Sequence, residues 1–499
     1  MKRSWAIGFT LYGLCFALTI GLRWPSFDQS YRQFEWNTAH SQVILDNWLE
    51  NGFWNERGIS IMNPPAIEFP SLLSRQPYVS YPCGAQLPLF VLAKILGLPI
   101  TFRFFQLWGL LWHGTIGVVF IAGLLILGVA RPEPERSLGA FLPGFFWLGG
   151  RGPLAIFPDQ WFSEMAVVLP FLLVVLAEVM VAHALVRKRY RQWITRLLPV
   201  LVFWGMYTDW LFAPLCAVIV LYRLLRRHPG NAVLPSLAWQ IMLPAASAIA
   251  IFLLQLFSVL GPGFLSALLD RFLLRSTLDT TAFATNLDML RLFFGHVTNY
   301  VGYPAISVAA LALLLLCVRH RSIPPAVKDC LFLLAVPSLA LLMIFRQHAA
   351  VHLFTVLKFL FPTYLLMGCI LPWAIDFPGK PRVIGLLASL FLLYEGLAYW
   401  SAADFAAFPQ EQQWEKAVRQ TFGYHDVLFT FEDTFETPAM PPMKLAISRK
   451  RIYLFDADHV RQVRAIPTAR VFLLGTARAI EALCPEKHVL HAAVYYCRL

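Results

Sequence analysis

Residues 23–54 read RWPSFDQSYRQFEWNTAHSQVILDNWLENGFW, and residues 78–84 read YVSYPCG. Both belong to one long segment between the first hydrophobic run and the next, and this segment is polar, aromatic and proline-rich. Two carboxylates, Asp28 and Glu35, follow directly after the first hydrophobic run. An acidic side chain at the mouth of a membrane span is costly to keep partly desolvated and is usually functional. We therefore expect this segment to form half of an active site at the outer membrane surface, on a frame of membrane helices.

The composition is that of a polytopic membrane protein. Of the 499 residues, 58% are hydrophobic and only 14% are charged, whereas about 25% of the residues in a soluble domain are charged. The formal net charge of +12 does not indicate nucleic-acid binding, because Lys and Arg accumulate in the cytoplasmic loops beside membrane spans. The eight Cys residues form no CxxC motif and no Cys/His metal spacing, so a zinc site is not expected.

Hydrophobic runs predict eleven membrane-spanning helices in an all-α frame. Residues 5–22 are too long for a typical signal peptide and no small-residue cleavage site follows them, so they are expected to remain as the first helix. Residues 85–98 are too short for a simple crossing and contain Lys94, which favours an interfacial or re-entrant helix. The predicted spans are residues 5–22, 104–130, 138–150, 161–186, 197–208, 211–225, 234–258, 300–318, 331–345, 352–371 and 382–400.

The distribution of Lys and Arg indicates the topology. With eleven spans and a cytoplasmic amino terminus, the short cytoplasmic segments carry 17 Lys and Arg, and the short outer turns carry 2. A crossing by residues 85–98 would reverse this bias, against the positive-inside rule. The outer side then receives the loop 23–103, a second loop near 259–299 and the tail 401–499.

Two of these outer segments have predicted structure of their own. Residues 264–278 place Asp270, Arg271 and Arg275 on the polar face of a helix that is expected to lie along the membrane surface, either as a functional element or as a solvated connector. The tail is expected to form a small α/β domain beside a transmembrane domain over residues 1–400, with a role in packing, gating or acceptor docking. Its predicted helices are residues 411–423 and 477–483, and its predicted strands are residues 426–432, 444–449, 451–456, 469–475 and 490–498.

Carboxylates from distant loops share the outer surface under this topology. Asp28, Glu35 and Asp159 could act in general-base catalysis, one taking a proton from an acceptor hydroxyl and another orienting it. The alternative for Asp159 is helix capping, because it stands where the fourth span begins. Glu164, one turn inside that helix, is a weaker candidate.

Cations gather at a second outer turn, in the sequence IFRQHAAVHLFTVLKFLFP at residues 344–362. We expect Arg346, His348, His352 and Lys358 to form a cradle for a phosphate group, since Arg gives bidentate contacts and Lys a point charge. The alternatives are a metal site at the two histidines and cations that reach the membrane interface. A substrate loop is expected from three further residues: Tyr78, Tyr81 and Asp209.

These segments resemble the C-type glycosyltransferases (GT-C), which take sugars from polyprenyl-phosphate carriers. The resemblance is to the bacterial group of protein O-mannosyltransferases and lipid A aminoarabinose transferases. It extends over residues 1–400 and rests on four local matches: an acid followed by FEWNTAHSQVILDNWLENGFW, then YVSYPCGAQLPLF, PDQWFSE and QHAAVHLFTVLKFLFP. Each match is weak alone, and the four occur in the order that the family shows.

The resemblance implies an enzyme of the bacterial inner membrane that transfers a sugar from a polyprenyl-phosphate donor to a glycan, lipid or protein acceptor, with inversion. It implies that Asp28 or Glu35 is the base that activates the acceptor, and Glu35 would depart from the Asp that is usual in the family. The family does not uniformly require a metal, so no cofactor is required and a divalent metal remains open. The alternative functions are a transporter or flippase of an anionic or lipid-linked substrate and a scaffold protein.

One disulfide is a further expectation. Cys484 and Cys497 both lie in the tail, which on the outer side would be in a compartment where disulfides persist. A turn between them must fold back for their Cα atoms to come within about 7 Å. The alternative is two separate buried thiols.

Overall fold

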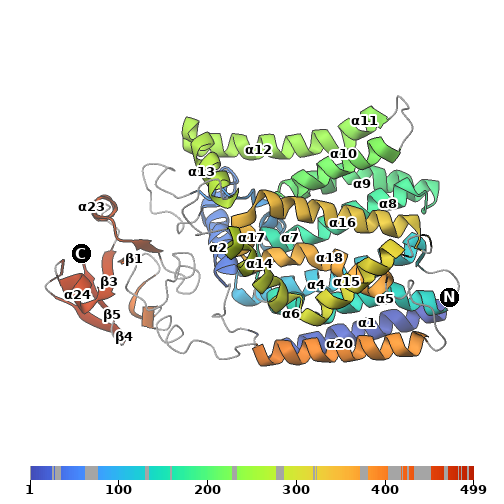
Figure 1. Cartoon of the computed structure of the whole chain (residues 1–499). Helices are drawn as coiled ribbons and strands as arrows, with labels where there is room; N and C mark the ends of the chain where they lie inside the picture. The colour runs from blue at the N-terminus through green and yellow to red at the C-terminus, as the bar shows by residue number, and fades with distance from the viewer. Residues whose placement is uncertain are drawn as a thin grey trace.

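Figure 1 shows the protein as a computed structural model. Asp28, Asp159 and the predicted strand 444–449 lie outside the residues that the structure describes. The described residues are 2–24, 27, 35–61, 77–129, 134–157, 160–226, 233–276, 286–318, 321, 323–370, 380–402, 417–418, 420–423, 426–431, 451–465, 470–481, 483–484, 486–491 and 494–499.

Long apolar helices form one bundle and run roughly along a common direction (Figure 1). Six described helical stretches are long and apolar enough to cross a membrane, so the chain is a multi-pass membrane protein. The span in α8 is the most enclosed, with 83% of its residues buried, whereas the spans in α1 and α20 are 11% and 17% buried and leave apolar faces for lipid. The elements that contain these spans are α1 (Lys2–Arg23), α4 (Phe102–Leu124), α7 with α8 (Ser163–Ala166 and Val168–Ala182), α11 to α13 with the turns η6 and η7 (Val233–Leu237, Ala238–Met242, Leu243–Leu260, Gly261–Gly263 and Phe264–Ser276), α16 (Pro325–Ile344) and α20 (Lys380–Ala402).

A seventh apolar stretch is a bent pair, in which α14 (Asn286–Tyr300) meets α15 (Tyr303–Val318) at 99°, as in a broken span or a re-entrant loop. Gly302 has φ +84° at the bend, a conformation that favours glycine, and a Cβ there would lie 2.9 Å from Arg151 Nη2, so the guanidinium would have to shift. Together these seven stretches coincide with seven of the eleven predicted spans.

The four remaining predicted spans are helices that are shorter or more polar than a single crossing requires. That these four helices cross the membrane therefore remains a prediction. The short α3 (Leu87–Leu96), which has 10 residues and contains Lys94, is likewise too short to cross alone. The four helices are α5 (Pro134–Gly149), α9 (Lys188–Met206), α10 (Phe212–Arg226) and α18 with η10 (Leu357–Leu365 and Leu366–Ile370).

The two ends of the bundle differ in character. The amino terminus lies at one end, and the β-sheet lies beyond the other (Figure 1). At the amino-terminal end, Glu178 of α8 forms a buried ion pair with Arg223 of α10, and Asp329 of α16 accepts from Tyr222 and Arg226. These contacts join three helices far from the sheet. Short helices gather at the sheet end, among them α2 (Glu35–Asn47), α13, α14 and α17 (Arg346–Val351) (Figure 1). The other short helices include η2 (Trp48–Gly52), η4 (Cys83–Ala85), α6 (Arg151–Ile156) and η9 (Leu353–Val356).

Indole groups fix the backbone of residues 77–86, which lead into α3. Gly84 N donates to Tyr207 O at 2.8 Å, and a Cβ at Gly84 would lie 2.3 Å from that oxygen, so this position requires glycine. The segment is therefore rigid, which holds Tyr81 in a defined place. Three indole N–H groups donate to its carbonyls: Trp161 to Ala85 (3.0 Å), Trp204 to Gly84 (3.1 Å) and Trp210 to Ser80 (2.7 Å).

The tail contains a five-stranded sheet in the order β2-β1-β3-β5-β4. The pairs β1–β2 and β1–β3 are parallel, and β3–β5 and β4–β5 are antiparallel. The single strand predicted over residues 490–498 is two strands, because the chain reverses and pairs β4 with β5. The tail elements are β1 (Asp426–Thr430), β2 (Arg451–Leu454), α23 (Ala457–Arg464), β3 (Arg470–Thr476), α24 (Ala477–Glu481), β4 (His488–His491) and β5 (Val494–Arg498), and of these α23 was not predicted.

Alternate residues of the central strands serve two different cores. Val427 and Phe429 pack with α23 and α24 on one face of the sheet. Leu428 and Leu474 point to the opposite face and pack against the tail residues Val418 and Phe422 and against Ala39 and Val43 of α2. The tail therefore covers one side of α2.

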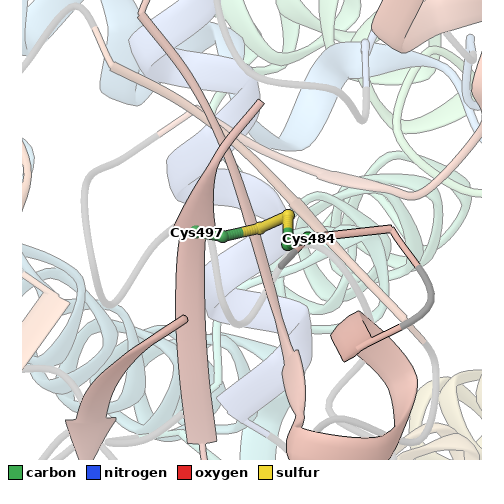
Figure 2. Close-up of a disulfide and its surroundings, with 2 residues drawn as sticks. All are labelled: Cys484 and Cys497. Carbon is green, nitrogen blue, oxygen red and sulfur yellow. A yellow bond between two sulfur atoms is a disulfide. The ribbon is translucent and has the colours of Figure 1, made fainter. Parts of the chain in front are cut away.

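The predicted disulfide is present. Figure 2 shows Cys484, which follows α24, bonded to Cys497 of β5, with 6.2 Å between the two Cα atoms. Both residues belong to the core on the α23 and α24 face of the sheet. The bridge therefore fixes the end of α24 to a central strand.

Candidate active site

Glu164 lies at the centre of a buried polar cluster at the sheet end of the bundle. It is in the first turn of α7, its residue is fully buried, and Ser163 Oγ donates to its Oε2 at 2.9 Å. His348 Nε2 lies 3.3 Å from Glu164 Oε1 and 2.9 Å from the Tyr81 hydroxyl. The structure thus joins three segments at one point, and Glu164 has a more central place than the sequence indicated.

Burial sets the protonation of this cluster. Desolvation raises the pKa of Tyr81 well above its usual value, with a further contribution from Glu164, so the phenol keeps its proton beside His348 Nε2. Desolvation lowers the pKa of His348 far below its usual value, and the nearby Arg275 acts in the same direction. His348 is therefore neutral at neutral pH and acts as a hydrogen-bonding group without a positive charge.

His352 and Arg346 flank His348 on the same outer turn. The His352 ring centroid is 4.5 Å from that of His348, and the His352 ring stacks on Phe354 at 5.0 Å. Arg346 begins α17 with an exposed side chain and makes no hydrogen bond or ion pair with another described residue. The structure brings the two predicted histidines together and leaves Arg346 at the surface.

Lys358 is paired with an acid. Its Nζ lies 3.4 Å from both carboxylate oxygens of Asp209, and both side chains are almost fully buried. Asp209 Oδ1 also accepts from Leu211 N at 2.7 Å, which holds the carboxylate at the start of α10. Lys358 was expected to bind phosphate and Asp209 to belong to the substrate loop. The structure places each as the partner of the other.

Arg275 supplies a cation that sequence reasoning did not place in the site. It lies in the last turn of α13, its guanidinium carbon is 4.6 Å from the centroid of the Tyr81 ring, and Nη2 donates to the Tyr78 hydroxyl at 3.5 Å. No described carboxylate lies within ion-pair distance of it. A partly buried guanidinium without a carboxylate partner suits an anionic group such as phosphate. The basic last turn of the predicted surface helix was the one signal for it in the sequence.

The segments that carry the predicted bases lie against each other. The structure describes Glu35 as the first residue of α2, and Asp28 and Asp159 lie outside the described residues. Two residues after Glu35, Asn37 Nδ2 donates to Oε1 of Gln160 at 3.4 Å. The amino-terminal part of α2 and the segment that follows Asp159 are therefore in contact.

The described residues contain no group of three or more His, Cys, Asp or Glu side chains that could hold a metal ion. The predicted bases Asp28 and Asp159 lie outside the described residues. A divalent metal at the predicted bases therefore remains an expectation from the sequence.

Solved structures reveal the fold of the chain. No protein-family model and no curated protein matches the sequence. The structure of ArnT from Cupriavidus metallidurans bound to undecaprenyl phosphate aligns with a TM-score of 0.66 over 100% of this chain and 98% of that chain, at 12% identity. The chain has the GT-C glycosyltransferase fold.

Two further structures support this assignment. The apo state of the same ArnT aligns with a TM-score of 0.62 over 99% of this chain and 98% of that chain, at 11% identity. The oligosaccharyltransferase AglB from Archaeoglobus fulgidus, in complex with an inhibitory peptide and a dolichol-phosphate, aligns with a TM-score of 0.55 over 96% of this chain and 70% of that chain, at 9% identity. The predicted resemblance to the GT-C proteins is confirmed for the fold. The tail sheet lies within the alignment to ArnT, since that alignment covers the whole chain.

Proposed function

We propose that the protein is a glycosyltransferase that moves a sugar from a polyprenyl-phosphate-linked donor to an acceptor hydroxyl. The observation that carries this proposal is Arg275, a guanidinium without a described carboxylate partner, placed on Tyr81 beside the Glu164–His348 pair. The fold adds support, because ArnT was solved with undecaprenyl phosphate and AglB with a dolichol-phosphate.

In the proposed reaction the acceptor oxygen bonds to the anomeric carbon while the bond from that carbon to the phosphate oxygen breaks. The electron pair of the broken bond stays on the phosphate, which leaves as polyprenyl phosphate. A carboxylate takes the proton of the acceptor hydroxyl, and Asp28, Glu35 and Asp159 are the candidates for this base. Direct attack opposite the leaving group inverts the anomeric centre.

Arg275 would bind the phosphate of the donor and stabilise the charge that develops on it as the carbon–oxygen bond breaks. The Tyr81 hydroxyl, kept protonated by burial, is a second hydrogen-bond donor that could turn from His348 to a phosphate oxygen. His348 and Glu164 would then position Tyr81. Arg275 and Tyr81 would thus supply a positive charge and a hydrogen-bond donor to the phosphate as it leaves.

We further propose that the sheet end of the bundle faces outward across the bacterial inner membrane, with the amino terminus in the cytoplasm. The 17-to-2 distribution of Lys and Arg over the predicted loops favours this orientation, and the opposite placement of the amino terminus and the sheet is consistent with it (Figure 1).

The test of the proposed function uses purified protein in lipid nanodiscs with radiolabelled undecaprenyl-phosphate sugars. Arg275→Met is expected to weaken the binding of undecaprenyl phosphate by roughly 10- to 100-fold, as for loss of a charge-assisted contact. Arg271→Met is the matched control, because Arg271 is an exposed cation on the same helix. Equal binding by both variants would remove Arg275 from the phosphate site. A transporter would move the labelled lipid unchanged, whereas an enzyme releases undecaprenyl phosphate.

A further inference from the structure

Three polar side chains are enclosed where α2 meets residues 160–162. Asn37, His40 and Gln160 are 0%, 0% and 2% exposed, although polar side chains of this kind are mostly found at the surface. Asn37 Oδ1, Gln160 Nε2 and both ring nitrogens of His40 have no hydrogen-bond partner in the part of the chain that the structure describes. Buried polar atoms are almost always paired, so a group of unpaired ones at one place is a candidate site for a polar ligand.

The backbone around the group is firmly held. Thr38 Oγ1 accepts from Trp161 N at 3.0 Å, and Ser41 Oγ donates to Trp161 O at 2.7 Å. Asn37 and Gln160 are also linked to each other, since Asn37 Nδ2 donates to Gln160 Oε1. The free atoms are therefore fixed in position before any ligand arrives.

The free atoms have the hydrogen-bonding pattern of a site for hydroxyl groups. Asn37 Oδ1 is an acceptor and Gln160 Nε2 is a donor. Burial lowers the pKa of His40 to about 3, so its neutral ring offers one donor and one acceptor. A hydroxyl both donates and accepts, which allows each of these atoms to be paired. None of them carries a charge, so the group is not suited to an anion.

Aromatic rings close the group on two sides. The His40 ring centroid is 4.6 Å from that of Tyr78 and 5.3 Å from that of Phe162. Apolar walls with a few fixed polar groups are typical of sites for small organic ligands. A sugar ring presents both hydroxyl groups and C–H faces and so matches both features.

Only the ring of Tyr78 lies between His40 and Arg275, the cation of the proposed phosphate site. Tyr78 contacts His40 on one side, and its hydroxyl accepts from Arg275 on the other. In a polyprenyl-phosphate sugar, the anomeric carbon is bonded to a phosphate oxygen, so the sugar must lie directly beside the phosphate. An anion that takes over the hydrogen bond of Arg275 would also release Tyr78, which is partly exposed and covers His40.

We propose that Asn37, His40 and Gln160 form the subsite that binds hydroxyl groups of the donor's sugar. This inference rests on the proposed function and deepens it, because it assigns the part of the site that distinguishes a sugar-bearing lipid from the bare carrier.

The experiment compares bare undecaprenyl phosphate with undecaprenyl phosphate that carries glucose, mannose, galactose or aminoarabinose, bound to the full chain in nanodiscs. His40→Phe and Gln160→Met are expected to lower the preference for the favoured sugar-bearing lipid over the bare lipid by roughly 10-fold or more, with binding of the bare lipid unchanged. His40→Gln, which keeps a polar group near Nε2, is expected to restore part of the preference. His488→Phe is the control, because His488 is exposed on β4 in the tail.

Thermal unfolding separates a binding role from a structural one. His40→Phe removes two unpaired nitrogens, so the midpoint is expected to stay within about 3 °C of the wild-type value. A larger decrease that accompanies the loss of preference, without rescue by His40→Gln, would mean that His40 stabilises the fold and would overturn the proposal.

The remaining outcomes are also decisive. If the variants keep the preference for the sugar-bearing lipid, the subsite is wrong and the proposed function stands. If the variants keep this preference and raise only the KM for the acceptor, then Asn37, His40 and Gln160 bind the acceptor, and their assignment to the donor is wrong. If the wild-type protein binds none of the four sugar-bearing lipids more tightly than the bare lipid, the inference fails, whereas the proposed function depends on the release of undecaprenyl phosphate in the assay described above.

Discussion

Replacing Lys358 tests whether its charge serves the fold or the substrate. The side chains of Lys358 and Asp209 are 2% and 1% exposed, and Nζ is 3.4 Å from both carboxylate oxygens. Lys358→Met removes one partner of this buried pair and leaves the other charge uncompensated, which costs about 3–5 kcal/mol. The variant is therefore expected to unfold far more easily than the wild-type protein.

The double variant Lys358→Met/Asp209→Asn separates the two roles. The Asn side chain keeps an oxygen for Leu211 N, which Asp209 Oδ1 accepts in the structure, and no charge remains at the site. Because both charges are gone, the double variant is expected to regain most of the lost stability. The coupling free energy between the two positions should then be about 2 kcal/mol or more in a double-mutant cycle.

The assay combines unfolding in detergent with binding of undecaprenyl phosphate. If the pair only stabilises the fold, both stability and binding of undecaprenyl phosphate should recover in the double variant. If Lys358 binds phosphate, stability should recover while binding remains weak. Unchanged stability of Lys358→Met would refute the reasoning from the buried pair altogether, and the original expectation of a phosphate cradle would regain its support.

The remaining predictions address catalysis, pH, the disulfide and topology. Glu35→Gln or Asp28→Asn is expected to reduce turnover by roughly 100-fold with little loss of stability, and near-normal rates for both would exclude them as the base. Burial lowers the pKa of His40 to about 3 from about 6.5 in the unfolded chain, so its titration does not affect stability above pH 6.5 and lowers stability as the pH falls toward 3. The thermal midpoint of His40→Phe should therefore decline less than that of the wild-type protein over this range, and parallel curves would contradict this. Alkylation of the unfolded protein without reductant should leave Cys484 and Cys497 unmodified by intact mass, and their bridge should stabilise the tail by about 3 kcal/mol; modification of both would disprove it. A reporter active only outside the cytoplasm, fused after the tail, should give a signal, and activity of a cytoplasm-only reporter there would reverse the orientation.

Local patterns in the sequence predicted much of the framework. Hydropathy over about 20 residues marks a membrane helix without knowledge of its neighbours, so six predicted spans coincide with long apolar helices and a seventh with one arm of a bent pair. In the tail, residues 426–432 and 469–475 were predicted to be strands, and they contain β1 and β3. The exception is the stretch 490–498, where the reversal between two short strands has no strong turn signal.

The site depends on contacts between distant segments, which local patterns do not contain. Lys358 and Arg275 both look like isolated cations in apolar surroundings, yet one has a carboxylate partner 149 positions away and the other has none among the described residues. Glu164 looked like a weaker version of Asp159, and only the fold places His348 against it. His40 gave no signal, because a lone histidine on a helix is uninformative until its neighbours are known.

The contact between the tail and α2 has a consequence for how the protein matures. Ala39 and Val43 emerge early in synthesis, but their partners Phe422 and Leu428 follow about 380 residues later, a delay of tens of seconds at a synthesis rate of roughly 5–20 residues per second. During that time the helix that starts at Glu35 exposes an apolar face, and it has its full packing only after the tail sheet has formed. A defect in the sheet would therefore leave the bundle in the membrane but remove part of the packing around α2. The tail can thus make the final packing of α2 depend on complete synthesis of the chain.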